Sequence, residues 1–281
     1  MPMPIPMLKT LRRLTGRLAI TSAALALALS AQAADNRLTL TGSSTIAPLA
    51  AEIAKRFEQQ NPGVRVDVQT GGSSRGVADA RSGLADIGMA SRSLKADEKD
   101  LTPHTLAMDG VGVILHSSNP LQTLTDDQIK AIYRGQIKNW KDVGGKDQAI
   151  TVVNKAEGRS TLELFLHYTG LKNSEIKAQV VIGDNQQGIK SVAANPGAIG
   201  YVSIGTAEYE ENHKTPIRLI PLRGVAATVA NVRDGKFPLS RPLNLVTKGA
   251  PTGLAKRYIE FATSGAVNDL VEAQFFVPLA R

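Results

Sequence analysis

The sequence predicts an α/β fold, and three observations carry the prediction. Short apolar segments alternate with amphipathic segments of helical length along most of the chain, as in folds where helices connect the strands of a sheet. Of the 281 residues, 42% are hydrophobic, so the chain can bury a sizeable core. No internal repeat or low-complexity tract interrupts the alternation. We therefore expect strands flanked by helices, in one large domain or two small ones.

Each expected strand is an apolar run bounded by glycine, proline or polar turn residues. In chain order the expected strands are residues 38–40, 64–68, 111–115, 150–153, 180–182, 198–202 and 243–246. The expected helices are residues 48–60, 76–82, 129–133, 162–168, 187–194 and 253–263. Pro48 suits a first helical turn because its missing N–H costs nothing there. Thr125 and the acidic pair after it form a helix cap, and the charged residues 208–213 read as a solvated surface run.

The first 33 residues resemble a cleavable secretory signal. Four basic residues precede an apolar stretch at 18–29, which is followed by an A-x-A cleavage site at Ala31-Gln32-Ala33. This stretch of twelve mostly apolar residues is too short to span a bilayer, which argues against a membrane anchor. No cysteine follows for lipid attachment, and Arg12-Arg13 leaves export by the Sec or the twin-arginine route open. The expected mature protein begins at Ala34 and is periplasmic.

Composition excludes several classes of function. The sequence contains no cysteine, so disulfides, thiol catalysis and thiolate metal sites are ruled out. The net charge is +8, and removal of the four basic residues of the signal leaves +4. Basic and acidic residues are interspersed and aromatic residues make up 4% of the chain, unlike the clustered basic surfaces that bind nucleic acid. A small anionic ligand suits this composition better.

Three places in the chain combine a strand end, glycine and hydroxyl residues, and a helix start. They are residues 42–45, residues 71–74 and residues 154–161, the last of which also carries Lys155 and Arg159. A helix that begins there presents free N–H groups and partial positive charge, which bind anions. Because strand-to-helix turns of an α/β domain share one edge of the sheet, the three loops are expected to converge on one anion. No metal or cofactor is needed.

One rival interpretation is enzymatic. Residues 72–76 match G-x-S-x-G, the nucleophile elbow of serine hydrolases, with Ser74 as the nucleophile. The chain has four histidines, all after Ser74 in sequence, but none lies in a segment that reads as a base-bearing loop. This interpretation also leaves the other two hydroxyl loops unexplained, so a binding protein without catalytic residues is favoured.

Together the motifs resemble the periplasmic phosphate-binding proteins of phosphate ABC transporters, within the type 2 periplasmic binding protein superfamily. The resemblance runs from Leu38 to about Leu279. Its motifs are G-S-S-T-I-A-P-L at 42–49, G-G-S-S-R-G at 71–76, A-D-I-G-M-A-S-R at 85–92, M-D-G-V-G-V-I-L at 108–115, L-T-D-D-Q-I-K-A-I-Y-R-G-Q-I-K-N-W at 124–140 and R-P-L at 241–243.

The resemblance implies two lobes, each a mixed sheet flanked by helices, joined by a two-strand hinge and closing on one phosphate. One lobe would comprise residues 34–113 and 242–281, and the other residues 114–241. The ligand-binding residues implied by it and by the loops are Ser44, Thr45, Ser73, Ser74, Arg75, Asp86, Lys155, Arg159, Ser160 and Thr161. The partner would be the membrane permease of an ABC transporter, and the protein itself a monomer.

Two details of that site carry specific expectations. The family's ligand-facing aspartate matches Asp86, which would accept the proton of phosphate and repel sulfate, which has none to give. The family often has arginine where Lys155 stands, and Arg159 would supply the missing guanidinium contact from a new position, with Arg75 and Arg92 also within reach. This departure keeps other tetrahedral oxyanions (molybdate, tungstate, sulfate) and a scavenging or sensory role open as alternatives.

Overall fold

The computed structural model describes residues 36–279, and the expected signal at 1–33 lies outside them. Its strands are β1 (Arg37–Gly42), β2 (Arg65–Thr70), β3 (Ile87–Ala90), β4 (Leu101–His116), β5 (Thr151–Lys155), β6 (Val180–Ile182), β7 (Ala198–Ser203), β8 (Ile217–Ile220), β9 (Ser240–Lys248) and β10 (Val277–Pro278). The α-helices are α2 (Ala47–Gln60), α3 (Ser73–Ser82), α4 (Asp126–Tyr133), α5 (Ser160–Thr169), α6 (Asn185–Ala193), α7 (Ile204–Asn212), α8 (Val229–Arg233), α9 (Gly253–Ala262) and α10 (Asn268–Ala273). Short 3-10 turns occupy Trp140–Val143, Asn173–Glu175 and Gly265–Val267.

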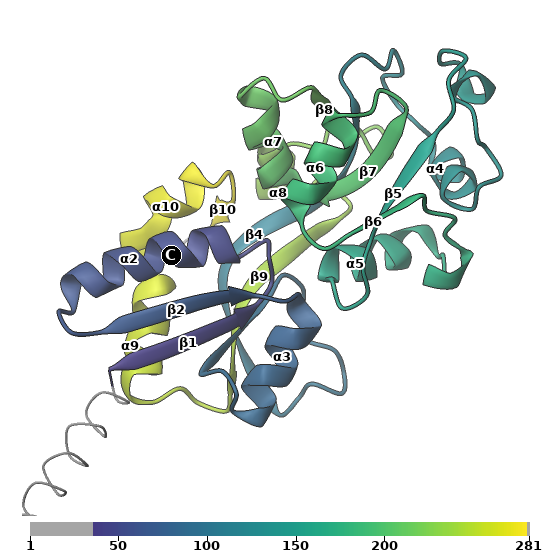
Figure 1. The fold of residues 1–281 in the computed structure, drawn as a ribbon. Helices are drawn as coiled ribbons and strands as arrows, with labels where there is room; N and C mark the ends of the chain where they lie inside the picture. Colours follow the sequence, from purple (N-terminus) through teal and green to yellow (C-terminus); the bar gives the residue numbers. More distant parts are fainter. Residues whose placement is uncertain (1–35, 280–281) are drawn as a thin grey trace, which may run out of the picture.

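The strands form one mixed sheet in the order β2-β1-β3-β9-β4-β7-β5-β6, with β8 and β10 also paired to β4. The outer strands on both sides pair in parallel, whereas β9 and β4 pair antiparallel with each other and with their neighbours. β4 and β9 are also the long strands that run between the two halves of the molecule in Figure 1. The α/β fold expected from the sequence is confirmed.

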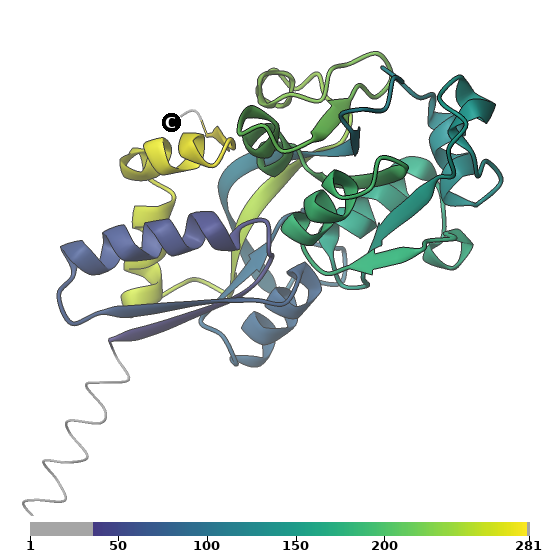
Figure 2. The same ribbon diagram turned by 45° about the horizontal axis from the view of Figure 1, so that its top comes forward.

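Two groups of buried side chains lie on either side of these long strands. In the first half, α2, α9 and α10 share a core with β1, β3 and β9, while Val77 of α3 packs on the other face of the sheet. In the second half, α4, α5 and α8 share a core with β4, β5 and β7, and α6 and α7 cover the opposite face. The two views in Figures 1 and 2 show the halves side by side, connected by β4 and β9. The lobe boundaries at residues 113 and 242 stay a prediction.

Local sequence explains where the helices begin and end. Pro48 occupies the first turn of α2, and Thr125 forms a complete capping box with Gln128 at the start of α4. Gly83 and Gly170 end α3 and α5 in the left-handed conformation that favours glycine. These signals place the starts of α2 and α3 directly after the carboxyl ends of β1 and β2.

One sequence-based expectation was wrong. β4 begins at Leu101, ten residues before the predicted strand, because its first part is polar and alternates weakly. Residues 208–213, expected as a surface run, are indeed not buried, and most of them belong to α7, which buries Ile204 and Ala207 before them. Among the described residues no helix has the length and apolar character required to cross a membrane.

Candidate anion-binding site

The helix starts meet at a small cavity between the two halves. Residues from both halves line it: Ser43, Ser44, Thr45, Gly72, Ser73, Ser91, Lys155, Arg159, Ser160, Thr161 and Gly183. Its volume is about 10 Å³, close to what a single water molecule requires, so the cavity is too small for an organic molecule. A larger groove of about 620 Å³ shares Ser44, Thr45, Arg159 and Gly183 with it, and we interpret that groove as the outer mouth of the same site.

The first wall is the turn from β1 into α2. Gly42 has φ +130°, and a Cβ there would lie 2.4 Å from the carbonyl oxygen of Met89, so the turn requires glycine. Ser43 Oγ accepts hydrogen bonds from the backbone N–H groups of Thr45 and Ile46 at 3.2 and 3.4 Å and donates to Ser91 Oγ at 2.9 Å. Ser43 therefore holds the start of α2 in place and leaves Ser44 and Thr45 facing the cavity.

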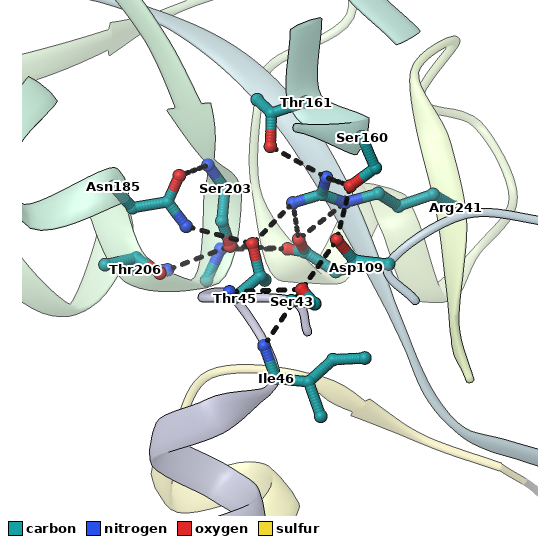
Figure 3. A network of polar contacts seen from close by, with 12 residues as sticks. Ser43, Thr45, Ile46, Asp109, Ser160, Thr161, Asn185, Ser203, Thr206 and Arg241 are labelled. Atoms are coloured by element: carbon teal, nitrogen blue, oxygen red, sulfur yellow. Dashed lines mark hydrogen bonds and ion pairs between the residues drawn. The ribbon is translucent and has the colours of Figure 1, made fainter. Parts of the chain in front are cut away.

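The Thr45 hydroxyl is oriented by its neighbours. Its oxygen accepts from Asn185 Nδ2 at 3.1 Å and from Arg241 Nη2 at 3.3 Å, as Figure 3 shows. A hydroxyl has two lone pairs and one proton, so these two donors occupy its acceptor sites. The Thr45 proton is left to donate to an anion in the cavity.

The second wall is the start of α3. Gly72 has φ +94°, and a Cβ there would lie 2.7 Å from the carbonyl oxygen of Gly158 and 2.9 Å from Arg159 Cδ, both in the other half of the molecule. Only glycine permits this approach of the two halves. Ser73 Oγ accepts from Ser91 N at 3.1 Å, and Ser91 Oγ lies 2.5 Å from Ser160 Oγ. A chain of hydroxyls thus crosses the floor of the cavity.

The third wall carries the positive charge. Lys155 is 3% exposed, and its Nζ donates to Asn185 Oδ1 at 2.9 Å. Burial lowers the pKa of Lys155 to about 7, and the nearby guanidinium of Arg241 adds to the effect. Arg159 precedes α5 and lies over Gly183, where a Cβ would be 3.4 Å from its Nη2. Within residues 36–279 no hydrogen bond or ion pair joins the Arg159 side chain to another group, which leaves its charge available.

Arg241 lies behind the cavity and forms hydrogen bonds to residues of both halves. It lies on β9 directly opposite Asp109 on β4, and its Nε and Nη2 donate to Asp109 Oδ2 at 3.1 and 2.8 Å, with both side chains 1% exposed. Its Nη1 donates to Thr161 Oγ1 at 3.0 Å and to Ser160 Oγ at 3.4 Å (Figure 3). Arg241 therefore contacts Thr45 of one half and the start of α5 in the other.

The structure brings together most of the predicted residues, namely Ser44, Thr45, Ser73, Lys155, Arg159, Ser160 and Thr161. Whether they bind an anion stays a prediction. Sequence reasoning missed Ser43, Ser91, Asn185 and Arg241, along with Asp109 behind the cavity. Arg241 had a usable signal, because the R-P-L motif places an arginine on a strand that connects the two halves.

Three predicted site residues point elsewhere. Ser74 Oγ donates to Glu163 Oε1 at 3.1 Å, and Arg75 is exposed and pairs with Asp79 one helical turn away. Asp86 lies at the opposite end of β3 from Ser91, where its Oδ2 accepts from Thr39 N at 2.7 Å. β3 has four residues, so this end is about 13 Å from the cavity. The predictions for all three were wrong.

Arg92 also turns away from the cavity, and it takes part in a contact between the halves. Its guanidinium forms a buried pair with Glu98 at 2.7 Å, and its Nε lies 2.9 Å from Glu163 Oε2 on α5. Lys95 Nζ lies 3.2 Å from Glu163 Oε1, and Ser74 also bonds this carboxylate. We call Glu163 with its three partners Ser74, Arg92 and Lys95 the rim cluster.

Comparisons with known proteins agree with this geometry. Residues 29–266 match the family model described as "PBP superfamily domain". The phosphate-binding protein PstS of Bacillus subtilis is 32% identical over 252 residues, which cover 88% of this chain and 82% of that protein. A crystal structure from Clostridium perfringens with bound phosphate, assigned to the substrate-binding proteins of phosphate ABC transporters, superposes with a TM-score of 0.80 at 32% identity, covering 87% of this chain and all of that one.

A second solved structure gives the same result. The ABC-type phosphate transport receptor from Vibrio cholerae has a TM-score of 0.71 and 31% identity, with 85% of this chain and 99% of that chain covered. These shares span nearly all the described elements, including both halves and the strands between them. The chain therefore belongs to the PBP superfamily and, within it, to the family of the PstS phosphate-binding proteins.

Proposed function

We propose that this protein captures inorganic phosphate between its two lobes and delivers it to the permease of an ABC transporter. The observation that carries the proposal is the small cavity, in which hydroxyls from both halves and the cations Lys155 and Arg159 of the second half face one space. Donors aimed at a desolvated anion form stronger hydrogen bonds than in water. The names of the relatives supply the choice of phosphate.

Capture requires the lobes to separate, and the hinge is formed by β4 and β9. These strands are the long connections between the two cores, so bending them opens the cavity without disturbing either core. In the open state Thr45 and Ser73 stay on one lobe, whereas Lys155, Arg159 and Ser160 move away with the other. The anion then bridges the lobes and favours the closed state.

The decisive test is calorimetric titration of the mature protein with phosphate, sulfate, molybdate and tungstate at one pH and one salt concentration. We expect phosphate to bind in the micromolar range or tighter. Arg75→Ala is a matched control for Arg159→Ala, because Arg75 lies near the same loops but pairs with Asp79 outside the cavity. Tighter binding of molybdate, tungstate or sulfate than of phosphate would refute the assignment.

We propose further that the protein is a binding protein without catalytic activity. The Ser74 hydroxyl donates to the Glu163 carboxylate rather than to a histidine, so it lacks the base that activates a serine nucleophile. Incubation with a fluorophosphonate probe is expected to leave Ser74 unlabelled. Labelling that disappears in Ser74→Ala would establish the hydrolase alternative.

The cellular role completes the proposal: the protein is exported, acts as a monomer and loads a transporter. Deleting its gene is expected to reduce uptake of phosphate at low external concentration, and restoring the gene is expected to restore uptake. Unchanged uptake would favour the scavenging or sensory role. Sequencing the N-terminus of the secreted protein tests cleavage before Ala34.

A further inference from the structure

The cavity combines positive charge with a lack of carboxylates. Among its lining residues, all within the described part of the chain, Lys155 and Arg159 are basic and none is acidic. Asp109 is close, but its Oδ2 takes two bonds from Arg241 and its Oδ1 accepts from Ser203 Oγ and Gly205 N at 3.0 and 3.3 Å. Asp184 lies in the adjoining groove and caps α6, so within residues 36–279 no carboxylate lines the cavity itself. The phosphate monoanion has two O–H groups that need acceptors and the dianion has one. The dianion also offers more negative charge to Lys155 and Arg159, so it suits the cavity better than the monoanion.

Lys155 is the group that can adapt its charge. It lies at the end of β5, and its ammonium has three donors, of which Asn185 Oδ1 takes one. The charged groups that face it are Arg241 from β9, Arg159 before α5 and Asp184 before α6. Asp184 is partly engaged, because its carboxylate caps α6 through Gln187 N at 2.8 Å.

Tyr201 on the adjacent strand β7 also contacts Lys155. Its hydroxyl accepts from the backbone N–H of Lys155 and donates to Asn154 Oδ1, and burial raises its pKa, so it stays neutral. Burial and the positive charges of Arg241 and Arg159 thus disfavour the charged form of Lys155, whereas the carboxylate of Asp184 favours it. This balance brings the pKa of Lys155 to about 7. A dianion that enters the cavity favours the charged form of Lys155 instead.

We propose that Lys155 takes up one proton from solvent when the phosphate dianion binds, so that capture is coupled to protonation of this lysine. The proton goes to the lone pair on Nζ, and no bond of the phosphate changes. Lys155 thereby limits the repulsion among cations in the empty cavity and supplies full charge once the anion is present. This inference rests on the proposed function and adds the ionic form of the ligand and the residue that neutralises it.

The proton balance changes sign with pH. With a pKa of about 7, Lys155 is mostly neutral at pH 8 before phosphate binds, so binding takes up a proton there. At pH 6 Lys155 is already charged while free phosphate is mostly the monoanion, so binding the dianion releases a proton. Affinity for total phosphate is therefore expected to be highest near pH 7 and to fall on both sides. If Lys155 were charged at every pH, binding of the dianion at pH 8 would take up no proton. If such a lysine instead bound the monoanion, binding at pH 6 would release no proton.

The test is calorimetric titration with inorganic phosphate at pH 6 and pH 8, each in two buffers of different ionisation enthalpy, from which the number of protons exchanged follows. We expect uptake at pH 8 and release at pH 6 in the wild type. Lys155→Arg keeps the charge but does not titrate, so it is expected to bind within about tenfold of wild type, to lose the uptake at pH 8 and to keep the release at pH 6.

A second variant reaches the same decision while keeping the lysine. Asn185→Asp places a carboxylate at Nζ, which charges Lys155 before the anion arrives, so uptake at pH 8 is again expected to disappear. Exchange of the same sign at both pH values in the wild type, or full uptake at pH 8 in either variant, overturns the proposal. A lack of binding heat with phosphate in every buffer would instead refute the proposed function itself.

Discussion

Two charged clusters connect the halves of this molecule, and they differ in when they can form. The Asp109–Arg241 pair is 1% exposed on both sides and joins residues directly opposite each other on β4 and β9. In the rim cluster Glu163 is 25% exposed, and its partners lie on the other lobe. Because the first pair lies on the proposed hinge strands, we expect it to persist whether the lobes are open or closed. We expect the rim cluster to form only on closure.

This difference separates stability from affinity. A buried ion pair that persists in every folded state contributes to the free energy of unfolding, and removing one partner leaves an uncompensated charge. A contact present only in the closed state leaves the stability of the open state unchanged and shifts the equilibrium toward closure. Charged-residue variants in the two clusters therefore separate the two effects.

The largest effect is expected for Asp109→Asn. Arg241 would keep its buried charge without a carboxylate, which costs about 3–5 kcal/mol of unfolding free energy. Urea denaturation without ligand measures this. The double variant Asp109→Leu with Arg241→Met removes both charges and is expected to recover most of the loss. A stability of Asp109→Asn within about 1 kcal/mol of wild type would contradict the permanent role of the pair.

Arg159 belongs to neither cluster, and its variant is expected to change affinity alone. Its guanidinium lines the cavity and has no hydrogen-bond or ion-pair partner in the described part of the chain. Arg159→Ala therefore removes a charged donor to the anion at a cost of about 2–4 kcal/mol of binding. Titration with phosphate is expected to show a loss of about 30- to 1,000-fold. Urea denaturation without phosphate is expected to match wild type, and binding within threefold of wild type would remove Arg159 from the site.

Glu163→Gln is expected to have a smaller effect of the same kind. The rim cluster is partly exposed, so it contributes about 1 kcal/mol, and phosphate affinity is expected to fall by roughly fivefold. The difference from wild type should shrink in high salt because exposed ion pairs are screened. Arg37→Ala is a suitable control, because it breaks an ion pair outside the cavity whose carboxylate, on Asp67, is about as exposed as that of Glu163. A loss of unfolding stability without ligand would mean that the cluster forms in the open state.

The part of the site that the sequence predicts is the part with a local signal. Glycine and hydroxyl residues at the starts of α2, α3 and α5 mark turns whose backbone conformation demands them, and these turns lie where expected. Asn185 carries no such signal, and Arg241 has only the R-P-L motif of its strand. The two reach the cavity through the packing of α6 and through strand pairing. Their roles depend on which segments the fold brings together.

The fold shows the same division between local and long-range information. The apolar strands β1, β5 and β7 were expected close to where they lie. The first part of β4 is polar. Residues such as His104 and Thr105 form hydrogen bonds to β9, and the strand character of this segment comes from that pairing. Asp86 failed for a related reason. The four-residue strand β3 separates Asp86 from Ser91, so the two residues lie at opposite ends of this strand.

Asp86 therefore gives the smallest effect on binding and the sharpest contrast with the two clusters. Its carboxylate accepts from Thr39 N on β1, in a region that also holds Arg37 and Lys248, so it connects two strands of one lobe and no residue of the other. Asp86→Asn keeps a side-chain oxygen that can accept the same bond. The ratio of phosphate to sulfate affinity, measured by titration at one pH and one salt concentration, is expected to be unchanged within about twofold. A marked gain in sulfate binding would mean that Asp86 senses the ligand despite its distance. An unchanged affinity ratio, together with a proton exchange that depends on Lys155, would mean that Lys155 rather than Asp86 selects the ionic form of phosphate.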